Sequence, residues 1–134
     1  MTDCLFCKIV SGEIPCHKIY EDKNCLAFLD INPVNLGHTL IVPKQHSKNI
    51  LDINDKILRE VIIVVKQLSN KIKKNLQCDG INIMINNESD AGQIILHTHI
   101  HIIPRFKKDG FKHWPSKKYK DGEAESFVKK IIEF

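Results

Sequence analysis

The segment Leu96-His97-Thr98-His99-Ile100-His101-Ile102-Ile103-Pro104 decides the fold and the chemistry expected of this chain. Its three histidines occupy alternate positions. In an extended strand, successive side chains point to opposite faces of the sheet. The three imidazoles then share one face, with roughly 7 Å between neighbours, while Thr98, Ile100 and Ile102 take the other. Such a row of imidazoles can bind a metal, transfer protons or attack phosphorus.

The chain has an ordinary size and composition for one globular domain. Its 134 residues suffice for one hydrophobic core. Hydrophobic residues at 43% and charged residues at 27% are average for a soluble protein, and the formal net charge of +4 is mild. We therefore predict a single domain over residues 1–134, with its core at about 4–105 and a C-terminal tail and helix at 106–134.

Basic residues cluster late in the chain, where they can attract phosphate-bearing small molecules. No run of aromatic residues and no helix-turn-helix pattern lies between them. We therefore interpret the cluster as a solvated face and predict no nucleic-acid partner. Its members are Arg105, Lys107, Lys108, Lys112, Lys117, Lys118 and Lys120.

The sequence predicts a cytoplasmic protein without a membrane partner. Residues Met1 to Leu5 show neither the basic n-region nor the apolar h-region of a signal peptide. The longest apolar stretch, around Val61 to Val65, is far too short to span a bilayer. The five cysteines are therefore expected to be reduced thiols or metal ligands, as in a cytosol.

Hydrophobic periodicity predicts strands grouped around one long amphipathic helix. This helix covers about 54–77, with Asp52 or Asn54 as its N-terminal cap and Asp79-Gly80 at its end. The strands are predicted at 18–21, 25–30, 38–42, 81–86 and 96–103, and short helical segments at 4–14 and 122–132. Because strands and helices do not alternate strictly, we predict an α+β domain on an antiparallel sheet. We expect Trp114-Pro115 to fold the polar segment 106–121 back over this domain.

Packing alone gives no reason for three histidines on one strand face, because burying three polar rings carries a desolvation cost. A neutral imidazole is a good nucleophile at neutral pH and, once phosphorylated, a good leaving group. One histidine can therefore divide a phosphoryl or nucleotidyl transfer into two easier steps.

The segment from His97 to Ile103 resembles the signature of the histidine triad (HIT) superfamily of nucleotide hydrolases and transferases, His-φ-His-φ-His-φ-φ with φ apolar. Thr98 is a mild departure from it. Other segments resemble the family in the same order, namely Cys4–Val10, Gly12–Pro15, Phe28–Ile31, Gly37–Lys44, Asn86-Asn87 and Ala91–Gln93. The resemblance implies a HIT-like fold and a Hint-like member, most like the bacterial proteins, that acts on purine nucleotide phosphoramidates. It also implies a homodimer with the long helix and a strand at the interface.

The resemblance further implies the catalytic roles. His99 would attack the α-phosphorus, and water would hydrolyse the nucleotidyl-histidine to release AMP or GMP, with no cofactor needed for catalysis. His101, protonated, would hold the non-bridging oxygens or help to expel the leaving group. His38 resembles the fourth active-site histidine. A carbonyl near His97 would fix the tautomer of the nucleophile.

Residues around the sugar and the base are implied in the same way. Asp30 would accept hydrogen bonds from the ribose hydroxyls, as an ionised carboxylate can. Its position before Ile31-Asn32-Pro33 also suits a turn. Phe6, Phe28 and Ile31 would flank the purine, although the phenylalanines are equally suited to a plain core.

The phosphate loop is expected to supply neutral donors. Asn86 and Gln93 match amide donors near the phosphate and leaving group, and Gly92 lets the backbone approach an anion closely. Eukaryotic Hint-like proteins carry a serine where this chain has Ile94, so one phosphate contact is missing. The preference for the leaving group is therefore left open.

A second constellation is the pair Cys4-x-x-Cys7, which on its own fits buried free thiols equally well. Together with His46 and His97, the pair would form a tetrahedral Cys2His2 zinc site of the closed, structural type. Bacterial relatives with this cysteine pair resemble that arrangement. We therefore predict a structural Zn²⁺ that occupies His97 and leaves His99 and His101 free for chemistry.

Two other functions stay open from the residues alone. All three histidines could bind the metal of a hydrolase with an activated water, which needs an open coordination position and usually a nearby carboxylate. Alternatively, the chain could be a non-catalytic module that binds nucleotides or other partners. The sequence fixes neither the purine nor the leaving group.

Overall fold

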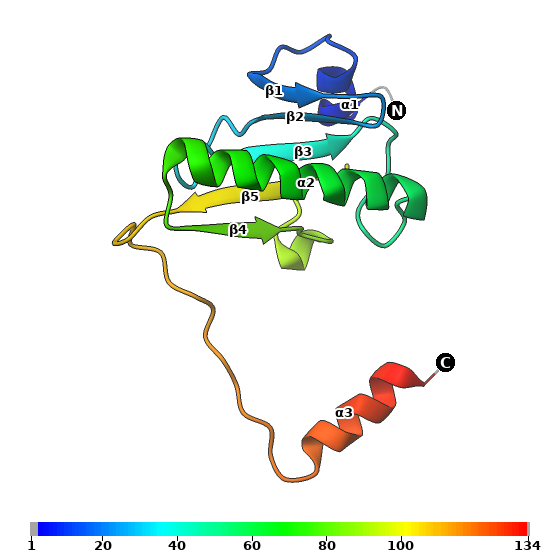
Figure 1. Ribbon diagram of the computed structural model, residues 1–134. Coiled ribbons are helices and arrows are strands. Elements are labelled where there is room, and N and C mark those ends of the chain that lie inside the picture. The colour runs from blue at the N-terminus through cyan, green and yellow to red at the C-terminus, as the bar shows by residue number, and fades with distance from the viewer. Residues whose placement is uncertain (1–2, 134) are drawn as a thin grey trace.

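Five antiparallel strands form one open sheet in the computed structural model, which describes residues 3–133 (Figure 1). The elements are α1 (Leu5–Val10), β1 (Lys18–Glu21), β2 (Cys25–Leu29), β3 (Thr39–Pro43), α2 (Asp55–Leu76), β4 (Gly80–Met84), η1 (Ser89–Ala91), β5 (Ile100–Arg105) and α3 (Glu123–Ile132). The strand order in the sheet is β1-β2-β3-β5-β4. The predicted α+β class, with an antiparallel sheet and one long helix, is confirmed.

Helix α2 begins and ends through local capping. Of the two candidate caps, Asn54 is the one used, because its Oδ1 accepts hydrogen bonds from the main-chain N–H groups of Lys56 and Ile57. The helix ends at Leu76, before the expected Asp79-Gly80, and its C-terminal cap Gln77 adopts the left-handed conformation. Gly80 instead opens β4. No helix within residues 3–133 combines the length and apolar character needed to cross a membrane.

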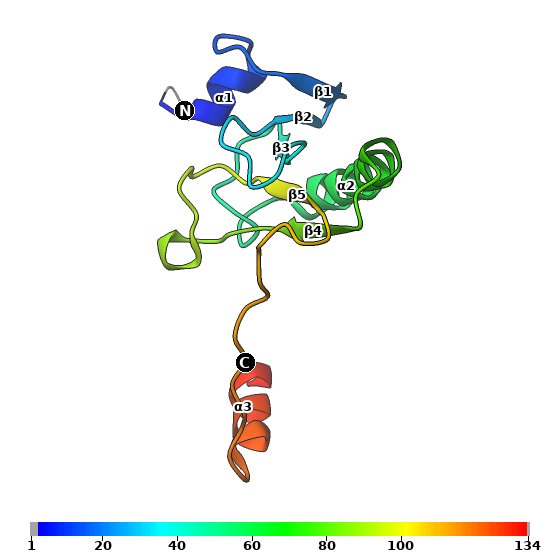
Figure 2. The ribbon, with the colours of Figure 1, turned by 90° about the vertical axis from the view of Figure 1, so that its left-hand side faces the viewer.

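The sheet carries α2 on one face and α1 on the other (Figure 2). Alternate residues of the central strands pack against α2, namely Cys25, Ala27, Ile41, Ile100 and Ile102. The intervening residues pack with Phe6 of α1, namely Leu26, Phe28, Leu40 and Val42. His101 lies between Ile100 and Ile102 of β5, and it pairs in register with Leu40. The alternation of strand side chains therefore directs His101 toward the α1 side.

Only one of the three aligned histidines lies in a strand. The predicted strand 96–103 actually begins at Ile100, so His97 and His99 precede it. Contacts with a distant segment explain the later start, because the N–H of Thr98 donates to the carbonyl of Ser47 at 2.8 Å. The hydroxyl of buried Thr98 also lies 2.7 Å from that of Ser47. The expected uniform row is therefore broken, and the His99 and His101 ring centroids lie 5.0 Å apart.

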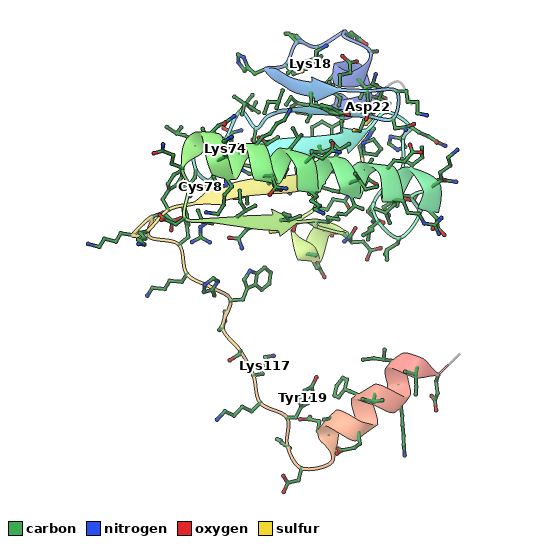
Figure 3. The ribbon with its side chains drawn as sticks, viewed as in Figure 1. Lys18, Asp22, Lys74, Cys78, Lys117 and Tyr119 are labelled. Atoms are coloured by element: carbon green, nitrogen blue, oxygen red, sulfur yellow. The ribbon has the colours of Figure 1, made fainter. Side chains whose placement is uncertain are left out.

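The C-terminal segment does not fold back over the domain. Figures 1 and 2 show α3 standing away from the sheet, and α3 has no buried residue. Lys117 and Tyr119 lie on the extended connection far from α2 (Figure 3). Trp114 is 87% exposed, so the expectation that Trp114-Pro115 packs on the domain is wrong.

Candidate active site

His38 and His101 form a hydrogen-bonded pair whose protons have fixed positions. Pairing of β3 with β5 brings His38 Nε2 within 2.9 Å of His101 Nδ1. The main-chain N–H of Val34 donates to His38 Nδ1 at 3.1 Å, so His38 carries its own proton on Nε2 and donates it to His101. His101 consequently carries its proton on Nε2. That atom is buried and has no hydrogen-bond partner within residues 3–133.

His99 is held in the tautomer that a nucleophile needs. Its Nδ1 lies 2.7 Å from the carbonyl oxygen of His97. A carbonyl oxygen only accepts, so Nδ1 carries the proton and donates it, and Nε2 keeps a free lone pair. The ring of Phe6 packs edge-on against the His99 ring at a centroid distance of 5.1 Å and restricts its rotation.

Burial keeps the histidines of this site neutral. It lowers the pKa of His38, and also that of His99, below the ordinary value, although the nearby Asp30 carboxylate opposes both shifts. Burial, together with the neighbouring His99 and His38, lowers the pKa of His101 to about 4. His101 is therefore neutral in the ligand-free chain at neutral pH, and the expectation of a protonated His101 does not hold for this state.

A cavity of about 500 Å³ opens beside His99 and His101, and this volume suits a small-molecule ligand. Phe6 and Phe28 form part of its apolar wall, with their rings in edge-to-face contact at 5.8 Å. Both also belong to the core, so the two interpretations of these residues are compatible. The sequence-predicted residues that line the cavity are Phe6, Phe28, Asp30, Ile31, Asn86, Gly92, His99 and His101.

Two polar groups of the cavity are held in place by the chain. Asp30 Oδ1 accepts from the N–H of Asn32 at 2.8 Å, while its Oδ2 lies 3.7 Å from His38 Nε2. The amide of Asn86 donates to the carbonyl of Gly92 at 3.4 Å. Gly92 has a φ of +90°, and a Cβ there would lie only 3.4 Å from the Asn86 amide nitrogen. The close approach of these two residues therefore favours glycine.

The structure places Gln93 apart from the cavity. Its side chain is buried, and its amide nitrogen donates to the carbonyls of Lys48 at 2.6 Å and Ile95 at 3.0 Å. Its amide oxygen accepts from the N–H of Glu88 at 2.8 Å and from the amide of Asn49 at 3.3 Å. With these partners inside the chain, Gln93 fixes the shape of the loop that carries Gly92.

A second cluster forms at the start of α1, where the predicted metal ligands come together. Cys4, Cys7, His46 and His97 offer one donor atom each, all within 4.8 Å of one another. The separations among the donor atoms include 3.3 Å for Cys4 Sγ to His97 Nδ1 and 3.4 Å for Cys7 Sγ to His46 Nδ1. Zinc ligands at 2.0–2.3 Å lie about 3.3–3.8 Å apart at the corners of a tetrahedron, so these donors fit such an ion.

The tautomer of His97 also suits a metal ligand. Its Nε2 lies 2.8 Å from the carbonyl of Pro43 and donates to it, which leaves the Nδ1 lone pair directed at the cluster. Burial lowers the pKa of His97, which favours the neutral form that binds metals.

The three triad histidines do not converge on one point. His97 belongs to the cysteine cluster, whereas His101 groups with His38 and Asp30, also within 4.8 Å. His99 belongs to neither of these potential ligand groups within residues 3–133. This separation argues against a single metal held by all three histidines.

Sequence reasoning missed the groups that orient the imidazoles. The carbonyl of Pro43 and the N–H of Val34 are main-chain atoms, so their residue types give no signal of this role. Leu5 and Ile9 of α1 also line the cavity. Their apolar spacing was visible in the sequence, but it indicated only that a helix packs somewhere.

Comparison with known proteins gives consistent matches. The model of the HIT domain family matches residues 11–108. The chain is 50% identical over 113 residues to an uncharacterized HIT-like protein of Borreliella burgdorferi, covering 83% of this chain and 81% of that protein. It is 47% identical over 107 residues to adenylylsulfatase HINT3 of Arabidopsis thaliana, covering 80% of this chain and 54% of that protein.

Solved structures share the fold. A HIT family member from Bacillus subtilis has a TM-score of 0.90 at 38% identity, over 96% of this chain and 94% of that one. A zinc-bound histidine triad protein from Mycobacterium smegmatis has a TM-score of 0.79 at 36% identity, over 87% of this chain and 85% of that one. A histidine triad nucleotide-binding protein from Candida albicans has a TM-score of 0.85 at 33% identity, over 96% of this chain and 94% of that one. The chain therefore belongs to the HIT family.

Proposed function

We propose that this chain hydrolyses purine nucleotide derivatives, in particular nucleoside 5′-phosphoramidates, through a covalent nucleotidyl-His99 intermediate. The observation that carries the proposal is the 2.7 Å contact between His99 Nδ1 and the carbonyl of His97. It leaves the Nε2 lone pair free beside a cavity large enough for a nucleotide. Dinucleoside polyphosphates, which present the same α-phosphorus, are a second substrate class.

Both chemical steps use His99. First, Nε2 attacks the α-phosphorus, the bond from phosphorus to the leaving group breaks, and the leaving amine departs with that electron pair and takes up a proton. Water then attacks phosphorus and loses a proton, and the electron pair of the N–P bond returns to Nε2. The products are the amine and a nucleoside monophosphate, AMP or GMP.

His101 is assigned the phosphate oxygens. Its buried Nε2–H is without a partner within residues 3–133, and such an orphaned donor is costly unless a ligand satisfies it. A non-bridging phosphate oxygen beside His99 would do so and would be stabilised as negative charge builds up on it. His38 positions His101, because the Nε2–H of His38 donates to His101 and thereby fixes the tautomer of His101.

Names of relatives support the substrate class. HINT3 of Arabidopsis is described as an adenylylsulfatase, and the Candida albicans neighbour as a nucleotide-binding protein. In this chain we assign the ribose to Asp30, the purine to the Phe6 and Phe28 wall, and the phosphate to Asn86 and Gly92, all of which line the cavity.

The covalent intermediate provides the test. The chain is mixed with adenosine 5′-phosphoramidate, denatured within milliseconds at alkaline pH, and analysed by mass spectrometry of the intact protein and its peptides. We expect one adenylyl group per chain, located on His99. An unmodified chain during steady turnover would refute the covalent route, and AMP binding without turnover would identify a binding module.

We further propose that Cys4, Cys7, His46 and His97 hold a structural zinc ion. Support comes from the fit of their donor atoms to a tetrahedron and from the zinc-bound neighbour of Mycobacterium smegmatis. The ion would tie the start of α1 to the segment before β5. All five cysteines are unpaired, as expected for the cytoplasmic location that we also propose.

The neutral His101 makes stability depend on pH. Its pKa is about 4 in the folded chain and about 6.5 when unfolded. Between these values the unfolded chain takes up a proton that the folded chain refuses, so the free energy of unfolding falls as the pH is lowered. Urea titrations at pH 7 and pH 5 measure this fall in the free energy of unfolding. His101→Gln should reduce it by up to about 1.4 kcal/mol per pH unit. The exposed His113→Gln should keep it; an unchanged profile in His101→Gln would contradict the assignment.

We also propose a homodimer formed at the β4 edge of the sheet. Ile83 of the edge strand β4 is exposed, and so are Ile62 and Ile63 of the long helix α2. The apolar side chains of α3, which include Phe127 and Ile131, are exposed as well. Such surfaces are expected to be covered in an assembly.

Ile83→Glu should convert this dimer to a monomer. A buried carboxylate at the interface would be desolvated without a partner. Light scattering after size-exclusion chromatography at micromolar concentration measures the mass. Leu36→Glu, on the β2–β3 loop, is the matched control and should leave the dimer intact. A dimer that survives Ile83→Glu would place the interface elsewhere.

A further inference from the structure

Helix α1 is a short element shared by two sites. Cys4 and Cys7, one at its N-cap and one inside it, point their sulfur atoms into the metal cluster. Leu5, Phe6 and Ile9 of the same helix line the nucleotide cavity. One short stretch of backbone therefore carries ligands for one site and a wall for the other.

His97 makes a second connection between these sites. Its ring is part of the cluster, 3.3 Å from the Cys4 sulfur, while its carbonyl accepts the Nδ1–H of His99. Phe6 touches both imidazoles, with centroid distances of 5.9 Å to His97 and 5.1 Å to His99. A displacement of the His97 ring would thus act on the nucleophile through the main chain and through Phe6.

The two sites share residues with a second cavity. This cavity, of about 680 Å³, is lined by Cys4 and His46 of the metal cluster. Leu5, Ile94 and Ile95 line both this cavity and the nucleotide cavity. Side chains of α1 and of the loop before His97 therefore border both the cavity beside the metal cluster and the proposed nucleotide cavity.

The position of α1 depends on what holds its ends. It has six residues, and a helix of this length has no stability of its own. Phe6 is its one buried residue, and the sulfur atoms of its cysteines are weak hydrogen-bonding groups. Coordination of both thiolates by one ion would replace these weak contacts with metal–ligand bonds that fix the helix.

We propose that a metal ion at the Cys4–Cys7–His46–His97 cluster and a nucleotide in the cavity bind with positive coupling, through α1 and His97. This rests on the proposed function, since it requires that the cavity binds nucleotides. The bound metal holds Phe6 and the His97 carbonyl in the arrangement that the nucleotide needs, so the nucleotide does not have to order them. By thermodynamic linkage, the nucleotide must strengthen metal binding by the same factor.

The coupling is measured on the unmodified chain in two independent titrations. AMP affinity is determined by calorimetry on the zinc-loaded chain and on the chain after dialysis against a chelator. Zinc affinity is determined by chelator competition with and without saturating AMP. We expect about a tenfold change in both. Equal AMP affinity with and without zinc would overturn the coupling and leave the proposed function standing; no AMP binding in either state would overturn both.

A matched pair of variants tests the route. Phe6 and Phe28 line the same cavity and are buried to a similar extent, but only Phe6 lies between the two cysteines. Phe28→Leu should weaken AMP binding in both states and keep the tenfold ratio. Phe6→Leu should lower the ratio clearly below tenfold, because only the connection through the His97 carbonyl is then left. An unchanged tenfold ratio of AMP affinities in Phe6→Leu would overturn the route through α1. The same unchanged ratio is expected if loss of the metal simply unfolds the chain.

Discussion

Replacement of His99 by alanine is expected to reduce kcat/KM for adenosine 5′-phosphoramidate by about 10³-fold or more, because it removes the attacking atom. AMP should still bind within about fivefold of its original affinity, since the cavity walls and the His101 donor stay in place. Turnover is followed by release of ammonia, AMP affinity by calorimetry, and the adenylyl adduct by mass spectrometry, where it should disappear.

An exposed histidine serves as the control. His17→Ala removes an imidazole from the surface before β1 and should leave turnover unchanged. Activity above a tenth of the original in His99→Ala would show that another group is the nucleophile. A hydrolase that uses an activated metal-bound water predicts a different pattern, in which no adduct forms and chelation abolishes all turnover.

Removal of zinc is expected to lower the free energy of unfolding by about 4 kcal/mol when free zinc had been about a thousandfold above its dissociation constant. For a domain of this size the corresponding decrease in Tm is roughly 10–20 °C. Metal analysis of protein prepared without chelator should find about one zinc per chain. The double variant Cys4→Ser, Cys7→Ser should bind no zinc and match the stability of the chelated chain.

A cysteine outside the cluster controls for the loss of thiols. Cys16 is half-buried and does not belong to the metal-ligand group, so Cys16→Ser should keep the zinc content and its contribution to stability. The zinc site would be refuted by metal-free protein from a preparation without chelator, or by a Tm that does not respond to chelation.

Elements set by local pattern were predictable from the sequence. The apolar spacing of α2 and the side chains that can cap it gave its position within a residue or two. The start of β5 was not predictable, because it depends on a distant part of the chain. There the carbonyl of Ser47 accepts a hydrogen bond from the N–H of Thr98. The same long-range contact explains Thr98 itself, whose hydroxyl would be costly at a buried position without Ser47.

The candidate site was predictable where side-chain chemistry defines it. His99, His101, Asp30 and Asn86, which the resemblance implied, line one cavity, and the cysteine pair meets His46 and His97 in a separate cluster. Gln93 was assigned to the phosphate on its amide chemistry, but the surrounding carbonyls and N–H groups satisfy that amide, and such main-chain partners cannot be identified from residue types. The neutral state of His101 in the ligand-free chain depends on burial, which residue types do not show.

The hydrogen bond from the Val34 amide to His38 has a consequence for selectivity. A peptide N–H does not ionise at physiological pH, so the imidazole pair is closed at that end and cannot carry protons beyond His38. A departing group must draw its proton from the open mouth of the cavity. We therefore expect the basicity of the departing group, more than the identity of the purine, to rank the substrates of this protein.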